Sequence, residues 1–152
     1  MEMRRATNED GEAVRELVFG VLAEFGLAGD PEGTDQDLGD IESSYDGRGG
    51  RFDVLVTEDG VIAGCVGLYP LREGVVELRK MYLRPECRGK GAGRRLLDHA
   101  LASARELGFK RVELETNSKL VEAVRMYERY GFQPVEGCHV AARCDATYAL
   151  DL

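Results

Sequence analysis

The chain has 152 residues, of which 43% are hydrophobic and 32% charged. This length suits one domain and this composition excludes wholesale disorder, so we expect residues 1–152 to form a single domain. No apolar stretch reaches the roughly 20 residues of a membrane helix, and the first five residues lack the apolar core of a signal peptide. We therefore expect a cytoplasmic protein with no membrane partner.

The charge is negative overall, with 20 basic and 28 acidic residues and a net charge of -8 at pH 7. A protein that binds nucleic acid non-specifically is expected to be basic, so we expect no nucleic-acid partner. Residues 1–60 hold 5 basic and 16 acidic side chains, whereas residues 61–152 hold 15 and 12. This asymmetry fits a cationic ligand on one side and an anionic ligand on the other, although solvated helix faces and loops would also produce it.

The cysteines form no Cys-x-x-Cys pair; they are Cys65, Cys87, Cys138 and Cys144. The group Cys138, His139 and Cys144 has no standard zinc spacing and no evident fourth ligand. We therefore expect no metal site, and reduced, partly buried thiols instead.

The first half of the chain predicts a short strand at residues 1–6 and then a helix. Apolar residues recur with helical spacing from Ala13 to Phe25, and Gly26 is a suitable end for that helix. Residues 28–50 are rich in Gly, Asp and Ser and predict a loop with one short helix near Asp35–Ile41. Long surface segments of this kind often carry substrate specificity.

Three strands are predicted next, at residues 52–58, 61–69 and 75–84, joined by tight turns into an antiparallel meander. The apolar residues of the third strand change parity, from even positions at Val76 and Leu78 to odd positions after them. Because side chains alternate between the faces of a strand, we predict a β-bulge near Arg79–Tyr82.

The second half predicts a crossover unit. An apolar helix face runs from Ala92 to Leu107, and a strand follows at residues 111–116, which should lie parallel to the strand before the helix. A second helix is expected over Lys119–Tyr130, followed by closing strands at 132–135 and 146–150.

The segment Arg88-Gly89-Lys90-Gly91-Ala92-Gly93 lies directly between a strand and a helix. Glycines let the backbone approach a ligand, and the free N–H groups at a helix start attract an anion. Residues 84–95 carry one acid, Glu86, and five basic side chains: Arg84, Arg88, Lys90, Arg94 and Arg95. This pattern suits a pyrophosphate, while a tight turn with solvated arginines is the simpler alternative.

Two other phosphate motifs do not fit this segment. A P-loop needs a Lys-Ser or Lys-Thr pair after its glycines, and none follows here. A dinucleotide fold needs Gly-x-Gly-x-x-Gly early in a βαβ unit, but Gly89, Gly91 and Gly93 have another spacing and follow an antiparallel meander.

The same segment resembles the acyl-CoA pyrophosphate signature of the GNAT superfamily of N-acetyltransferases, Arg/Gln-x-x-Gly-x-Gly/Ala. Glu77–Pro85 resembles the strand before this motif, Leu114–Asn117 the next strand, and Ala123–Phe132 the following helix with its Gly-Phe ending. The similarity covers roughly residues 75–135. It implies an α/β (α+β) fold with a mixed, mostly antiparallel sheet of six to seven strands, a splayed parallel central pair and flanking helices.

The resemblance also implies that acetyl-CoA is the cosubstrate and binds where the two parallel strands splay apart. The pantetheine arm would pair with the strand backbone near the bulge, and the pyrophosphate would rest on the glycine segment. The implied cofactor-binding residues are Met81, Tyr82, Leu83, Arg88, Gly89, Lys90, Gly91, Ala92, Gly93, Asn117, Ala123 and Tyr127. Asn117 has an alternative role in capping the helix that follows it.

Direct attack of an amine on the thioester needs a neutral amine, a donor for the oxyanion and a proton for the leaving thiolate. In the family pattern Glu77 matches the base, a backbone N–H near Met81 the donor, and Tyr127 the acid. The alternatives are a Glu77 that is exposed or paired with an arginine, and a Tyr127 that is a core aromatic residue.

We therefore predict an N-acetyltransferase that transfers the acetyl group of acetyl-CoA to a primary amine of a small molecule or amino acid in a ternary complex. The alternative is an acyl-CoA sensor without turnover. An Arg143–Asp145 pair is a candidate for holding an amino acid acceptor, His99 is expected on the surface, and a homodimer through the late strands is possible because such dimers are common in the family.

Overall fold

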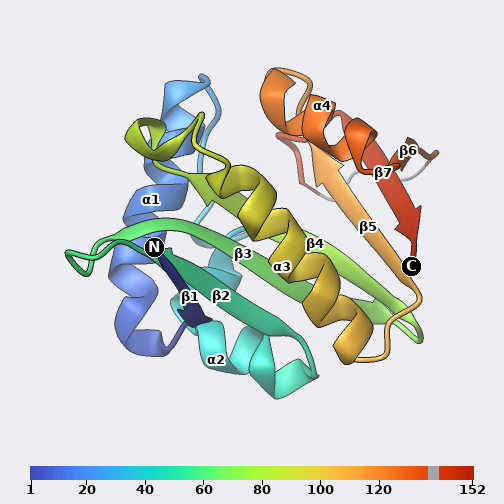
Figure 1. Ribbon diagram of the computed structural model, residues 1–152, viewed down its shortest axis with the longest axis horizontal. Coiled ribbons are helices and arrows are strands. Elements are labelled where there is room, and N and C mark those ends of the chain that lie inside the picture. The colour runs from blue at the N-terminus through green and yellow to red at the C-terminus, as the bar shows by residue number, and fades with distance from the viewer. Residues whose placement is uncertain (137–140) are drawn as a thin grey trace.

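The computed structural model describes residues 1–136 and 141–152, so Cys138 and His139 lie outside the described residues. The described residues form a central seven-stranded sheet with the order β1-β2-β3-β4-β5-β7-β6, and among these strands only β4 and β5 are parallel neighbours (Figure 1). The mixed, mostly antiparallel sheet predicted from the sequence is thereby confirmed. The strands are β1 (Glu2–Arg5), β2 (Arg51–Val56), β3 (Ile62–Arg72), β4 (Val75–Leu83), β5 (Arg111–Thr116), β6 (Gln133–Pro134) and β7 (Ala146–Asp151).

The described residues form four α-helices, and none of them has the length and apolar character needed to span a membrane. They are α1 (Gly11–Glu24), α2 (Ile41–Ser44), α3 (Ala92–Glu106) and α4 (Val121–Arg129). The short helix predicted near Asp35–Ile41 is a 3-10 turn over Gln36–Gly39. The α-helix begins after that turn because the Asp40 carboxylate accepts a hydrogen bond from the backbone N–H of Ser43 at 3.1 Å, which caps α2.

Each face of the sheet carries its own hydrophobic core, because successive strand side chains point to opposite faces. In β2, for example, Val54 belongs to the core beneath α1 and α2, whereas Leu55 belongs to the core beneath α3 and α4. Figure 1 shows α3 crossing one face of the sheet over β3 and β4. The helices therefore sandwich the meander and hold β4 in place from both sides.

β4 and β5 pair over only three residues, from Val75 opposite Arg111 to Glu77 opposite Glu113. Beyond Glu77 the two strands diverge towards their C-terminal ends, as Figure 1 shows. The predicted splayed pair is thus present, and Glu77 stands at its fork.

The bulge predicted in the third strand of the meander is confirmed. Cys65 pairs with Tyr82 and Gly67 with Arg79, so β4 holds one more residue than β3 between these two positions. Lys80 lies inside the bulge with a φ of 55°, and no other non-glycine residue among the described ones has a positive φ.

The Gly50→Ala substitution should destabilise the protein by roughly 1–3 kcal/mol, because the added methyl group would collide with the backbone carbonyl of Leu68 and lie 2.8 Å from Pro70 Cδ. The control is Gly20→Ala in α1, where no atom lies within 4 Å of the new Cβ. Alanine there should stabilise the protein by up to about 1 kcal/mol through helix propensity. Urea denaturation of both variants tests this, and equal stabilities would contradict it.

Candidate functional site

A cleft of about 1160 Å³ opens where β4 and β5 diverge. Its walls come from the C-terminal half of α1, from β4, from the start of α3, from the end of β5, and from α4. Arg143 and Cys144 close it from the segment before β7. Of the predicted site residues, those that line the cleft are Glu77, Met81, Tyr82, Leu83, Arg88, Gly89, Gly91, Gly93, Asn117, Ala123 and Tyr127.

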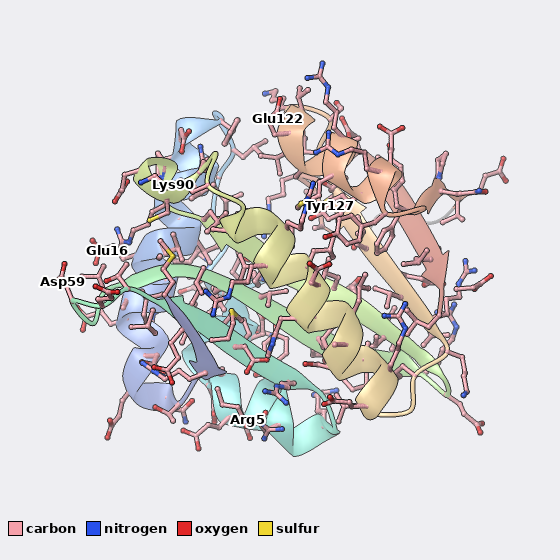
Figure 2. All side chains as sticks on the ribbon, viewed as in Figure 1. Arg5, Glu16, Asp59, Lys90, Glu122 and Tyr127 are labelled. Carbon is pink, nitrogen blue, oxygen red and sulfur yellow. The ribbon has the colours of Figure 1, made fainter. Side chains whose placement is uncertain are left out.

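The glycine segment forms one end of the cleft and leads into α3. Gly89 and Gly91 have φ values of 76° and 80°, a left-handed conformation that other residues rarely adopt. Gly91 occupies the N-cap of α3, so the unpaired N–H groups of the first helical turn face this end of the cleft. Lys90 is exposed and Ala92 is buried, and neither side chain lines the cleft; Figure 2 shows Lys90 in the loop that precedes α3.

Arg88 lines the cleft, but its guanidinium already has partners within the chain. It donates to both carboxylate oxygens of Glu24 at 2.6 and 3.0 Å and to the carbonyl oxygen of Leu83 at 3.1 Å. These contacts tie the glycine segment to the end of α1 and to the end of β4. Arg84, another basic residue of this region, donates to the carbonyl of Ile62 and does not line the cleft.

Tyr127 lies on α4 (Figure 2). Its ring packs against that of Phe132, at a centroid distance of 5.6 Å. Only 6% of the residue is exposed. Burial, followed by the charge of neighbouring Tyr82, raises the pKa of Tyr127 well above its ordinary value of 10. Tyr127 therefore keeps its proton at neutral pH and is available as a hydrogen-bond donor.

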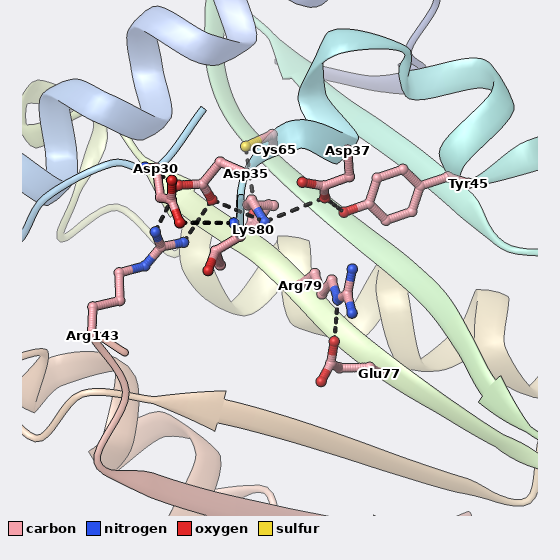
Figure 3. Close-up of polar contacts among 10 residues, drawn as sticks. Asp30, Asp35, Asp37, Tyr45, Cys65, Glu77, Arg79, Lys80 and Arg143 are labelled. Carbon is pink, nitrogen blue, oxygen red and sulfur yellow. Dashed lines mark hydrogen bonds and ion pairs between the residues drawn. The ribbon is translucent and has the colours of Figure 1, made fainter. Parts of the chain in front are cut away.

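Glu77 is 9% exposed and pairs with Arg79 (Figure 3). The Arg79 guanidinium also lies 3.7 Å from the ring centroid of Tyr69. The expectation of an arginine partner is therefore met, and the expectation of an exposed glutamate is not. The carboxylate still lines the cleft at the fork between β4 and β5.

The side chain of Asn117 is bonded within the chain at both ends. Its Nδ2 donates to the carbonyl of Arg143 at 2.6 Å, and its Oδ1 accepts from the backbone N–H of Lys119 at 2.9 Å. Asn117 thus fastens the end of β5 to the segment before β7. The N-cap position of α4 is Leu120. Asn117 therefore does not cap this helix, and its side chain forms a turn just before it.

A buried cluster of charged groups borders the cleft, and sequence reasoning did not find it. Arg143 donates to both oxygens of Asp35 at 2.7 Å (Figure 3). Lys80 Nζ lies 3.2 Å from Asp35 and 3.3 Å from Asp37, and Asp37 accepts a hydrogen bond from Tyr45. The only available signals were the Gly- and Asp-rich composition of residues 28–50 and the parity change in β4.

The two residues suggested as an acceptor pair have other partners in the structure. Arg143 pairs with Asp35, and the Asp145 carboxylate accepts hydrogen bonds from the backbone N–H and the hydroxyl of Ser118. The expectation that His99 lies on the surface is wrong. His99 is half-buried, with Nε2 at 3.1 Å from Asp53, because the face of α3 that carries it packs on the sheet. Among residues 1–136 and 141–152, no three His, Cys, Asp or Glu side chains are arranged to hold a metal ion.

Comparison with known proteins identifies the family of this chain. Residues 21–132 match the acetyltransferase (GNAT) family. The chain is 36% identical to the uncharacterized N-acetyltransferase YjgM of Escherichia coli over 158 residues, covering 99% of this chain and 94% of the relative. A GNAT-family acetyltransferase structure from Staphylococcus aureus superposes with a TM-score of 0.93 at 22% identity, covering 99% and 98% of the two chains.

A second solved structure, a phosphinothricin acetyltransferase from Sinorhizobium meliloti in complex with acetyl-CoA, has a TM-score of 0.78 at 21% identity and covers 99% of this chain and 88% of its own. The chain belongs to the GNAT family of acetyltransferases and is an acetyltransferase by class.

Acidification should weaken the Asp35–Arg143 contact. Burial opposes the charge of Asp35, but the hydrogen bonds from Arg143 and from the backbone of Asp30 outweigh it and lower the pKa from 3.8 to about 2. The stabilisation by this carboxylate is therefore complete above pH 3.8 and is lost as the pH falls towards 2, an effect of roughly 2 kcal/mol. Urea unfolding at several pH values should show the stability gap between wild type and Asp35→Asn shrinking below pH 4, and a gap independent of pH would contradict this assignment.

Proposed function

We propose that this acetyltransferase transfers the acetyl group of acetyl-CoA to a primary amine of a small molecule or amino acid, and that residues 1–152 act as one catalytic domain. The observation that carries the proposal is the cleft with an anion-attracting glycine turn at one end and Glu77 and Tyr127 on its walls. The acetyl-CoA held by the Sinorhizobium enzyme supports the choice of cosubstrate.

The geometry of β4 supports the placement of the cosubstrate. Because β5 leaves β4 after Glu77, no strand in the described part of the chain adjoins the backbone polar groups of Met81–Leu83 on that side. An extended ligand with amide groups, such as the pantetheine arm, can pair with such an edge as an added strand would. The pyrophosphate would then reach the N–H groups at the start of α3.

The reaction is a direct transfer. The amine nitrogen bonds to the thioester carbon, the carbon–sulfur bond breaks, the nitrogen loses a proton and the sulfur of CoA gains one. Glu77, directly or through water, accepts the proton of the amine, and Tyr127 donates to the leaving sulfur. Because the pKa of Tyr127 is raised, this phenol acts chiefly as a hydrogen-bond donor that stabilises the thiolate as it forms. The proton that the sulfur finally gains comes from solvent.

Cys144 lines the cleft, yet it does not suit a covalent acetyl-enzyme. Burial, followed by the negative charge of Glu115, raises the pKa of Cys144 to about 11, so the thiol stays protonated at neutral pH. A protonated thiol is a poor nucleophile, which favours attack by the acceptor amine itself.

The proposal is tested by following CoA thiol release from acetyl-CoA with a panel of amines and amino acids. Turnover with at least one acceptor, and acetylation of that acceptor by mass spectrometry, is the expected result. Tight CoA binding without turnover across the panel would instead favour an acyl-CoA sensor. Absence of both binding and turnover would contradict either function.

The Tyr127→Phe variant should lower kcat roughly 100-fold, because it removes only the hydroxyl group that stabilises the leaving thiolate. The affinity for CoA should change little. Tyr148→Phe, on β7 and outside the cleft, is the matched control and should keep wild-type activity. A fully active Tyr127→Phe enzyme would remove this residue from the mechanism.

The Glu77→Gln variant should lower kcat roughly 100-fold near pH 7 and recover in part as the pH rises towards 10. The reason is that an alkyl amine, with a pKa near 10.4, loses its proton to solvent at high pH and no longer needs a base. Glu73→Gln, in the exposed turn between β3 and β4, is the control. A loss of activity equal at every pH would indicate a structural role through Arg79.

A further inference from the structure

The backbone of Lys80 adopts a conformation that its own side chain does not favour. Its φ of 55° is left-handed, where a Cβ atom crowds the neighbouring carbonyl oxygen, so surrounding contacts must hold it there. A lysine, rather than a glycine or asparagine, occupies this position in the bulge next to the cleft. Contacts of the lysine side chain must therefore stabilise a backbone conformation that is unfavourable by itself.

The side chain of Lys80 is anchored at its far end by two buried carboxylates. Its side chain is 4% exposed, and Nζ lies 3.2 Å from Asp35 and 3.3 Å from Asp37, whose side chains are 0% and 7% exposed (Figure 3). Asp35 is also held by Arg143, and Asp37 by Tyr45. Separating a buried ammonium group from such partners costs free energy, so these contacts hold the Lys80 side chain in place.

The other side of the bulge is held by Cys65 on β3. Its thiol donates to the carbonyl oxygen of Lys80 at 3.0 Å, and the backbone N–H of Tyr82 donates to its sulfur. In a trans peptide group, the carbonyl oxygen and the following N–H point in opposite directions. Since the Lys80 carbonyl points to the Cys65 thiol, the N–H of Met81 points away from that thiol, and Met81 itself lines the cleft.

We propose that Lys80 is a positioning residue: held between Asp35 and Asp37, it fixes the bulge so that the N–H of Met81 stands in the cleft and donates to the carbonyl oxygen of the thioester. This inference rests on the proposed acetyl transfer. The N–H group contributes to catalysis because it is already oriented before negative charge develops on that oxygen. Residues 28–50 therefore anchor β4, in addition to any contact that they make with the acceptor.

The test compares Lys80→Met with the double variant Lys80→Met/Asp37→Asn. The double variant removes one buried positive and one buried negative charge, so it keeps the charge balance of the cluster while losing the ammonium anchor. Lys110→Met, at an exposed lysine before β5, is the control for the substitution itself. Thermal unfolding establishes that each variant is folded before its kinetics are measured.

We expect kcat of the folded double variant to fall roughly 10- to 100-fold with the best acceptor of the amine panel. The affinity for CoA should stay within about threefold, because the glycine segment is unaltered. A purely structural role would lower stability and leave kcat of the folded double variant at the wild-type value, which would overturn the proposal.

A second readout does not depend on turnover. The chain has four methionines, so protein labelled with ¹⁵N-methionine gives a simple amide spectrum in which Met81 is assigned with Met81→Leu. In wild type, acetyl-CoA should shift the Met81 amide signal beyond the shift caused by CoA, which lacks the thioester carbonyl, and this difference should disappear in the double variant. If the difference persists there, the Lys80 proposal fails; if neither ligand changes the wild-type spectrum and no amine is acetylated, the proposed function itself fails.

Discussion

The early separation of β4 from β5 is the constraint on which the site depends. A parallel pair that stayed hydrogen-bonded over its whole length would leave no room for a ligand between the strands. Here pairing ends at Glu77 and Glu113, and the bulge at Lys80 lies three residues beyond that fork. The cleft is therefore a gap in the middle of the sheet. The catalytic candidates lie on its two sides, with Glu77 on β4 and Tyr127 on α4.

The negative charge of the N-terminal part has a structural use at this gap. Asp35 and Asp37 turn inward to Lys80 and Arg143, so part of the acidic excess of residues 1–60 neutralises buried cations instead of facing solvent. Arg143 comes from the segment before β7 and lines the cleft, and Asp35 comes from the segment before α2. One ion pair thus joins the two halves of the sheet that the fork separates.

Hydrogen bonds between helices and loops complete the walls. Tyr130 on α4 donates to Asp98 on α3 at 2.7 Å, and Arg88 joins the glycine segment to Glu24 at the end of α1. Burial, helped by the bond to Asp98, raises the pKa of Tyr130 to about 12, so this contact is unchanged across neutral pH. The cleft is consequently held from several elements, which suits a site in which reacting groups must be oriented before the substrate arrives.

Local patterns in the sequence were sufficient to predict most helices and strands and part of the candidate site. The spacing of apolar residues placed the main helices and strands, the parity change located the bulge, and the glycine segment identified the anion-attracting end of the cleft. These features depend on periodicity, turn residues and helix termini, which act over a few neighbours in the chain. The Gly-Phe ending after α4 and the candidate role of Tyr127 came instead from the resemblance to the GNAT family.

Only the tertiary structure decided which distant charges meet. Arg143 was a candidate for holding an acceptor together with Asp145, two residues away, but its guanidinium pairs with Asp35, which lies 108 positions earlier in the chain. Lys80 had no assigned role until the fold brought two aspartates to its ammonium group. Ion pairs between distant segments follow from how the elements pack, and no local pattern encodes them. The sequence by itself determined the elements and the family, and the packing of residues 28–50 against β4 decided how the candidate site is held.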